Sequence, residues 1–244
     1  MSIEALRTLI DGAKRIVFFG GAGVSTGSGI PDFRGTDGLY TAVHTYDAPP
    51  EEILSGSYLK KHPHQFYEYY KNEMLYPNAR PNGAHTALAK LESMGKLTAV
   101  ITQNIDGLHQ TAGSQNVIEL HGSVLRNYCV SCGKSYPLSY ITGAKDIPHC
   151  EKCGGTVRPD VVLYGEGLDN GAFTEAAKEI AASDLLIVGG TSLTVYPAAG
   201  LLRYFRGESF VILNKSETPY DAYADLIIRE PIEEVLEKAV ADIQ

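Results

Sequence analysis

The stretch Ile16-Val17-Phe18-Phe19-Gly20-Gly21-Ala22-Gly23 decides the fold of this chain. Its four apolar residues predict a short buried strand, which the glycines end. A strand that runs directly into a glycine-rich turn is typical of a dinucleotide site, because glycines let the backbone approach a pyrophosphate. The alternative is a tight strand–helix turn without a ligand. Thr26 stands at the third glycine position of the fingerprint, and no acidic residue closes a second strand at the usual distance.

Apolar runs of the same kind recur along the chain, separated by segments with helical spacing. The predicted strands after the first are residues 97–102, 117–120, 161–164, 185–190 and 210–214. Buried strands that alternate with helices predict an α/β protein with a Rossmann-like parallel sheet and helices on both faces. Thr191 and Ser192 follow one strand and Asn214 ends another, where open α/β sheets bind ligands. Their hydroxyl and amide groups suit phosphate and ribose.

All four cysteines of the chain lie in two C-x-x-C pairs, Cys129/Cys132 and Cys150/Cys153. Two such pairs supply four thiolates, which complete a tetrahedral zinc shell and leave no position for water. Two disulfides, or a redox dithiol with spare thiols, are the alternatives. The spacing favours one structural Zn2+ in a small zinc ribbon, so the chemistry must lie elsewhere.

Composition limits the classes of partner. The chain has 244 residues, with 21 Lys and Arg against 29 Asp and Glu, so its net charge is −8. An acidic chain is poorly suited to direct nucleic-acid binding and better suited to a lysine-rich partner. The sequence has no recognisable secretion signal and no apolar run of transmembrane length, so we expect no membrane association. Zinc thiolates fit a reducing interior, and we expect a cytoplasmic location.

Several motifs together resemble one protein family. The segment 21–35 (GAGVSTGSGIPDFRG) is similar to the signature of the sirtuins, NAD-dependent protein-lysine deacylases. Segments 102–109 (TQNIDGLH) and 119–122 (ELHG) resemble the second and third sirtuin blocks, and Gly165-Glu166, residues 190–193 and the zinc ribbon follow in family order. The resemblance covers nearly the whole chain and is closest to the small bacterial members.

The resemblance implies a division into two units. Residues 1–35, 80–121 and 159–244 would form the Rossmann-like NAD-binding domain. Residues 36–79 and 122–158 would form a small inserted domain with a helical part and the zinc ribbon.

The resemblance also implies the residues that hold NAD as co-substrate. Ala22, Thr26, Phe33 and Arg34 would line the phosphate and nicotinamide-ribose end. The nicotinamide pocket would contain Ser25, Asn104, Ile105 and Asp106, and Gln103 and Asn104 would contact the ribose. The adenosine half would meet Thr191, Ser192, Asn214, Lys215 and Ile232.

His121 is the expected general base, and Asn104 the second catalytic residue. His121 follows an apolar strand and precedes Gly122, which places it at a sheet edge. A neutral imidazole can remove a proton from a ribose hydroxyl at physiological pH. His109 is the competing histidine, interpreted as structural.

The acyl-lysine protein or peptide would bind between the two units. One wall would contain Val161, Leu163, Gly165 and Glu166, and the other Leu193 to Tyr196, with Val195 and Tyr196 in contact with substrate. Relatives that prefer succinyl-lysine carry a Tyr-x-x-Arg pair, whereas Tyr67 is here followed by Tyr70. Burying an acyl carboxylate without a cation is costly, so we expect acetyl or longer uncharged acyl groups.

The expected activity is transfer of the acyl group to ADP-ribose, with release of nicotinamide and O-acetyl-ADP-ribose. A protein mono-ADP-ribosyltransferase is the first alternative, a non-catalytic NAD-sensing regulator the second, and a hydride-transferring dehydrogenase the third. The dehydrogenase lacks the full glycine fingerprint and an evident alcohol site.

Overall fold

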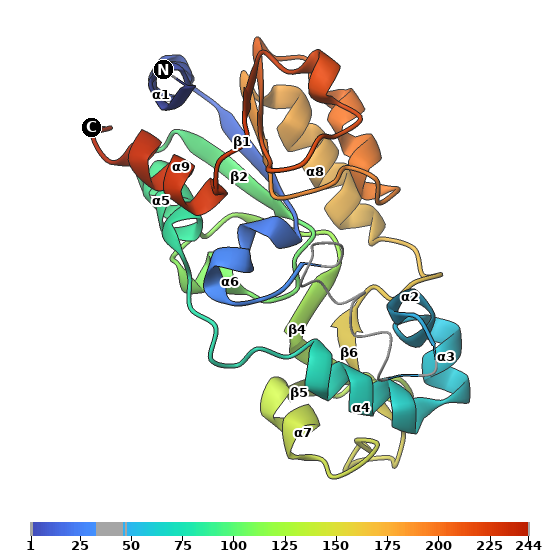
Figure 1. The fold of residues 1–244 in the computed structure, drawn as a ribbon. Helices are drawn as coiled ribbons and strands as arrows, with labels where there is room; N and C mark the ends of the chain where they lie inside the picture. The colour runs from blue at the N-terminus through green and yellow to red at the C-terminus, as the bar shows by residue number, and fades with distance from the viewer. Residues whose placement is uncertain (1, 33–45, 47, 244) are drawn as a thin grey trace.

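A computed structural model describes residues 2–32, 46 and 48–243 of the chain. Figure 1 shows two sheets at different ends of the molecule, with β1 and β2 in the upper part and β4–β6 in the lower part. Among the helices of the described residues, none has the length and apolar character needed to cross a membrane.

The larger sheet is parallel and has the strand order β3-β2-β1-β7-β8-β9. Its strands are β1 (Ile16–Gly20), β2 (Leu97–Thr102), β3 (Val117–Glu119), β7 (Leu185–Gly189), β8 (Ser209–Leu213) and β9 (Leu226–Ile228). The order reverses between β1 and β7, which makes these two strands the topological switch point where doubly wound sheets bind ligands. The predicted Rossmann-like sheet is confirmed.

Alternate residues of the strands face opposite layers of helices, because side chains in a strand point to the two faces in turn. On one face Phe18, Ile187 and Val211 pack against α1 (Ser2–Gly12), α5 (Gly83–Ser93) and α9 (Ile232–Val240). On the other face Phe19, Val188 and Ile212 pack against α8 (Asn170–Ala182) and the 3-10 helix η4 (Ala198–Tyr204). Both layers are visible in Figure 1, with α5 and α9 on one side of the sheet and α8 on the other. Burial on both faces explains why the strands read as continuous apolar runs.

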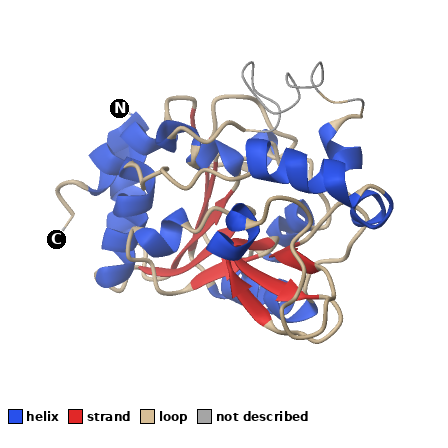
Figure 2. Ribbon diagram, turned by 90° about the horizontal axis from the view of Figure 1, so that it is seen from below, coloured by secondary structure: helices blue, strands red, loops and turns tan. Residues whose placement is uncertain are grey.

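The smaller sheet is antiparallel, with the order β5-β4-β6. Its strands are β4 (Gly122–Cys129), β5 (Ser135–Pro137) and β6 (Val157–Val161). Figure 2 shows the strands of both sheets in red among the blue helices. A third apolar cluster joins this sheet to the helices α2 (Pro50–Ile53), α3 (Gly56–Lys61), α4 (Pro63–Glu73) and α7 (Leu138–Gly143).

Strand β6 differs from the sequence expectation. Residues 161–164 were expected to return the chain to the main sheet, but Val161 pairs with Gly122 of β4. Tyr164 instead forms an isolated bridge with Ser55 at the start of α3. The physical reason is that β4 is the central strand of the smaller sheet: β5 pairs with one of its edges and β6 with the other as far as Val161, so the chain leaves this sheet only after residue 161.

The remaining elements are short. They are α6 (Leu108–Thr111) and the 3-10 helices η1 (Ala22–Val24), η2 (Thr26–Ser28) and η5 (Asp221–Tyr223). Helix η1 begins at Ala22, one residue after the end of β1, so the predicted glycine turn leads into helical backbone.

Gly122 marks the passage from the larger sheet to the smaller one, and its backbone has φ of +76°. A Cβ there would overlap the carbonyl oxygen of Asp160 on β6. We expect Gly122→Ala to lower the free energy of unfolding by about 2–3 kcal/mol, because it adds left-handed strain and a backbone clash. Denaturant unfolding measures this loss.

Gly143 at the end of α7 is the matched control, since a Cβ there meets nothing within 4 Å. Gly143→Ala should change stability by less than about 0.5 kcal/mol. Equal losses in the two variants would contradict the role assigned to Gly122.

Candidate active site

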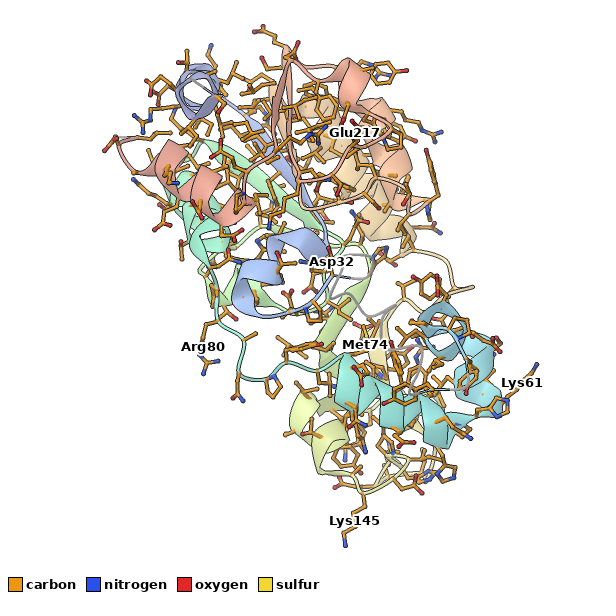
Figure 3. All side chains as sticks on the ribbon, viewed as in Figure 1. Asp32, Lys61, Met74, Arg80, Lys145 and Glu217 are labelled. Atoms are coloured by element: carbon orange, nitrogen blue, oxygen red, sulfur yellow. The ribbon has the colours of Figure 1, made fainter. Side chains whose placement is uncertain are left out.

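A cleft of about 1210 Å³ opens at the switch point and extends to the smaller sheet. Asp32 after η2 and Met74 after α4 both line it, and Figure 3 labels them in the middle of the molecule, while Lys61 lies at the right-hand edge and Lys145 at the lower end. Most described residues that were predicted to bind NAD or substrate line this cleft: Ala22, Ser25, Thr26, Gln103, Asn104, Ile105, Asp106, His121, Val161, Leu163, Gly165, Glu166, Thr191, Ser192, Val195, Tyr196, Asn214, Lys215 and Ile232. Leu193 and Thr194, expected in the second substrate wall, do not line it, and Leu193 is buried in the core of the larger sheet. Phe33 and Arg34 lie outside the described residues.

The loops after β1 and β7 touch through their backbones at the base of the cleft. The N–H of Gly23 donates to the carbonyl of Gly190 over 2.8 Å, and the N–H of Gly21 donates to Gly189 over 3.2 Å. Gly190 has φ of +60°, and a Cβ on Gly23 would lie 2.8 Å from the Gly190 Cα. The glycines therefore allow two loops to approach more closely than side chains permit.

A hydrogen-bond network fixes the polar groups of one pocket. The buried Ser25 hydroxyl donates to Asp106 Oδ2 over 2.7 Å and accepts from Asn104 Nδ2 over 3.1 Å. The other Asp106 oxygen accepts the N–H of Leu108, over 2.8 Å. Asn104 is further held by its own N–H, which donates to the Thr102 hydroxyl over 3.0 Å. These residues are preorganised to meet an amide group, since their side chains are already oriented.

Gln103, which follows β2, is hydrogen-bonded at both central strands of the larger sheet, to the end of β1 and to the loop after β7. Its Nε2 donates to the Thr191 hydroxyl over 3.1 Å, and its N–H donates to the Gly20 carbonyl over 3.0 Å. Asn214 lines the cleft, and its Nδ2 donates to the Ser216 carbonyl over 2.9 Å.

His121 is half-buried in the cleft, at the point where the chain passes from one sheet to the other. The preceding N–H, of Leu120, donates to Thr102 of β2, while the His121 carbonyl accepts the N–H of Val162 beyond β6. The ring Nδ1 lies 2.9 Å from the Gln103 carbonyl oxygen. A carbonyl only accepts, so Nδ1 carries the proton and Nε2 has a free lone pair.

Burial lowers the pKa of His121 below the ordinary histidine value of 6.5, and the hydrogen bond to Gln103 partly opposes this shift. The imidazole is therefore neutral at pH 7, as a general base must be.

His109 is buried behind the site and does not line the cleft. Its ring lies 4.7 Å from that of His85 and 6.2 Å from that of Phe18. Among the described residues neither of its ring nitrogens has a hydrogen-bond partner. Burial, with a smaller contribution from His85, lowers the pKa of His109 to about 3. The His109 ring is therefore uncharged and packs in the core, in line with its interpretation as a structural residue.

The Glu166 side chain is fixed by an ion pair and a backbone hydrogen bond. Its carboxylate accepts two hydrogen bonds from Arg158, over 2.6 and 2.9 Å, and the N–H of Leu163, over 3.0 Å. The same Arg158 donates to the Val161 carbonyl over 2.8 Å. The ion pair thus fixes the backbone of residues 161–163 at the cleft wall, where Val161 and Leu163 are buried.

Arg158 itself was missed by sequence reasoning. An arginine between the apolar positions of a strand that also supplies Val157 and Val161 was the available signal. On the opposite wall, Val195 and Tyr196 are exposed, and the Tyr196 side chain is 68% accessible.

The four cysteine sulfurs lie within 4.8 Å of one another at the tip of the smaller sheet. The Sγ atoms of Cys129 and Cys153 are 3.5 Å apart, and those of Cys132 and Cys150 are 3.6 Å apart. A disulfide needs about 2.05 Å. Ligands of a tetrahedral zinc with Zn–S bonds of about 2.3 Å lie about 3.8 Å apart. The cluster therefore fits a structural zinc ion with a closed shell.

The fold and the site together define a doubly wound nucleotide-binding protein with a zinc ribbon. The sequence model of the Sir2 family matches residues 21–197. The chain is 54% identical to an NAD-dependent protein deacetylase of Clostridium acetobutylicum, and 54% identical to one of Clostridium perfringens, in each case over 239 residues that cover 98% of both chains. A solved structure of a Sir2 protein with deacetylated p53 peptide and 3'-O-acetyl ADP ribose superposes with a TM-score of 0.90 at 39% identity, covering 100% of this chain and 99% of that one.

This chain belongs to the Sir2 family. The resemblance inferred from the sequence motifs is thereby confirmed.

Cys132 is exposed, so its replacement by serine removes little packing. We expect Cys132→Ser to lose bound zinc and to unfold at a lower temperature, because metal binding and folding are coupled. Metal analysis and thermal unfolding of the same preparation measure both effects.

Ser131→Ala alters the same exposed turn without removing a thiolate and should retain zinc. A soluble, metal-free Cys132→Ser protein with unchanged thermal unfolding would refute the structural role of the metal.

Proposed function

We propose that this protein is an NAD-dependent protein-lysine deacetylase. It transfers the acyl group of a modified lysine to ADP-ribose and releases nicotinamide and O-acetyl-ADP-ribose. The observation that carries the proposal is His121, a neutral imidazole with a free Nε2 in the cleft between the two sheets. Membership of the Sir2 family and relatives named as deacetylases support it.

The residues at the switch point fit a bound dinucleotide, which supplies the ADP-ribose acceptor when present. We assign Ala22 and Thr26 to its phosphate end, and we extend this to Phe33 and Arg34 on the sequence motif alone. The pocket of Ser25, Asn104 and Asp106, bordered by Ile105, would orient the nicotinamide amide, because its donors and acceptors are fixed before binding. Gln103 would face the ribose, and the adenosine half would lie against Thr191, Ser192, Asn214, Lys215 and Ile232.

His121 would accept the proton of a ribose hydroxyl at Nε2, while Nδ1 stays bonded to Gln103. Asn104 would hold the same ribose in position. The walls of the cleft would limit the access of water to the reacting carbon. Orientation of the two substrates would supply much of the acceleration of the reaction.

The acyl-lysine peptide would bind as an extended segment between residues 161–166 and residues 193–196. Val161 and Leu163 would contact the acyl-lysine chain, and Gly165, Val195 and Tyr196 would border its entrance. Glu166 would act by holding this wall in place through Arg158.

We also propose that the chain is organised as an NAD-binding domain (1–35, 80–121 and 159–244) and a small domain (36–79 and 122–158). The pairing of β6 with β4 argues for moving the second boundary to residue 161. A cytoplasmic location, with protein substrates and neither nucleic acid nor membrane as partner, accords with zinc thiolates and a net charge of −8.

His121→Ala tests the proposed base. With NAD and an acetyl-lysine peptide, we expect formation of O-acetyl-ADP-ribose to fall about 10²–10⁴-fold, the contribution of a general base. The wild-type rate should fall on acidification with an apparent pKa below the ordinary histidine value of 6.5, because burial lowers the pKa of His121. Product mass spectrometry across pH measures both, and it would reveal ADP-ribosylated protein if the chain were a mono-ADP-ribosyltransferase.

His64 on α4 is exposed and pairs with Asp146, so His64→Ala is the control and should retain activity. Turnover by His121→Ala close to that of the wild type would show that another group is the base.

Tyr70 tests the acyl preference. Its side chain is 1% exposed and lines the cleft beside Leu54, Val124 and Leu163, without a cation among these neighbours. We expect the wild type to deacylate acetyl-lysine far faster than succinyl-lysine, since a carboxylate buried among these described side chains would have no cationic partner. Tyr70→Arg should raise the succinyl-to-acetyl ratio of kcat/KM about tenfold, because an arginine pairs with a carboxylate.

Tyr70→Gln is the matched control, a neutral residue at the same position, and should leave that ratio low. Equal turnover of both peptides by the wild type would contradict this preference while leaving the deacylase assignment intact.

A further inference from the structure

A tyrosine hydroxyl contacts the zinc ribbon from outside the set of cysteines. Tyr136, on β5, is buried, and its hydroxyl donates a hydrogen bond to Sγ of Cys150 over 3.2 Å. The same hydroxyl oxygen accepts the N–H of Glu151 over 3.1 Å. Tyr136 follows the first cysteine pair in sequence, whereas both of its partners belong to the second. The hydroxyl thus links the two halves of the ribbon.

The four thiolates have unequal surroundings. Cys129 and Cys150 are buried, whereas Cys132 and Cys153 are exposed. Cys129 Sγ accepts the N–H of Ser131, a weak contact of 3.4 Å within its own turn. Cys150 Sγ accepts from backbone N–H groups of its own turn and also from the hydroxyl of Tyr136, a side chain distant in sequence. A donor to a metal-bound thiolate stabilises its negative charge and fixes its direction, which are the two effects that retain a metal.

The Tyr136 ring is itself held in place. It packs against the tilted ring of Tyr140 with 4.2 Å between ring centroids, and Lys134 Nζ lies 4.9 Å from its centroid. Lys134 also pairs with the Glu151 carboxylate over 2.9 Å. Because these contacts order the ring before any ligand binds, the hydroxyl reaches Cys150 without a further loss of side-chain freedom.

We propose that Tyr136 is a positioning residue of the zinc site, which retains the metal through its hydrogen bond to Cys150. This role concerns the lifetime of the bound zinc and does not depend on the deacetylase assignment. In this proposal the buried Cys150 is the last ligand to leave the metal. Release of zinc begins at the two exposed ligands, Cys132 and Cys153.

Tyr136→Phe removes the hydroxyl and keeps the ring. Transfer of zinc from the full-length holoprotein to an excess of chromogenic chelator should be about tenfold faster than in the wild type. Tyr140→Phe is the matched control, because its hydroxyl donates to the His149 carbonyl over 2.6 Å and, among the described residues, forms no hydrogen bond to a cysteine sulfur. That variant should release zinc within about twofold of the wild type. An unchanged rate for Tyr136→Phe, or an equal acceleration in both variants, would overturn the proposal.

Two measurements separate a bond to sulfur from a loss of packing. In cobalt-substituted protein, the thiolate-to-cobalt charge-transfer band should shift in Tyr136→Phe and remain in place in Tyr140→Phe. If Tyr136→Phe does not fold, 3-fluorotyrosine placed at position 136 keeps the ring and strengthens the donor, so zinc release should become slower than in the wild type. Release that is equal or faster would overturn the proposal.

Discussion

The site depends on a backbone contact between two glycine loops. The hydrogen bonds from Gly21 and Gly23 to Gly189 and Gly190 hold the ends of β1 and β7 together, where the strand order reverses. From this point the helices on the two faces diverge, so a space remains above the strand ends that no side chain fills. The polar residues at the other strand ends, Gln103 among them, face the same space because parallel strands share one carboxyl edge.

The second sheet gives this space its other wall. The chain passes directly from β3 to β4, and His121 lies between them, with Leu120 bonded to the larger sheet and Val162 bonded to His121 itself. The histidine is therefore fixed from both sheets, which explains how a strand-end residue has a defined orientation. The zinc ribbon orders β4–β6 at a distance from the chemistry, since its closed sulfur shell has no position for water.

Much of the site could be predicted because its signals are local. The spacing of the four cysteines identified them as one set of metal ligands, and apolar runs identified five of the six strands of the larger sheet. The short edge strand β9 was missed. Membership of β6 in the smaller sheet was not predictable, since an apolar strand carries no mark of its partner. The pairing of Glu166 with Arg158 was also missed: two charged residues eight positions apart meet only through the turn after β6. The roles of Phe33 and Arg34 remain predictions from the motif.

The sequence by itself determined the class of fold, the zinc ligands, the family and the candidate base, because each depends on residue type and short spacing. The tertiary structure decided which histidine faces the cleft. His109 ends the segment 102–109 and His121 follows an apolar strand, and each was a candidate. In the fold, His109 packs beside Phe18 and His85, whereas His121 meets the Gln103 carbonyl in the cleft. That difference arises from long-range packing of helices and sheets, which sets burial and hence the proton-binding properties of each imidazole.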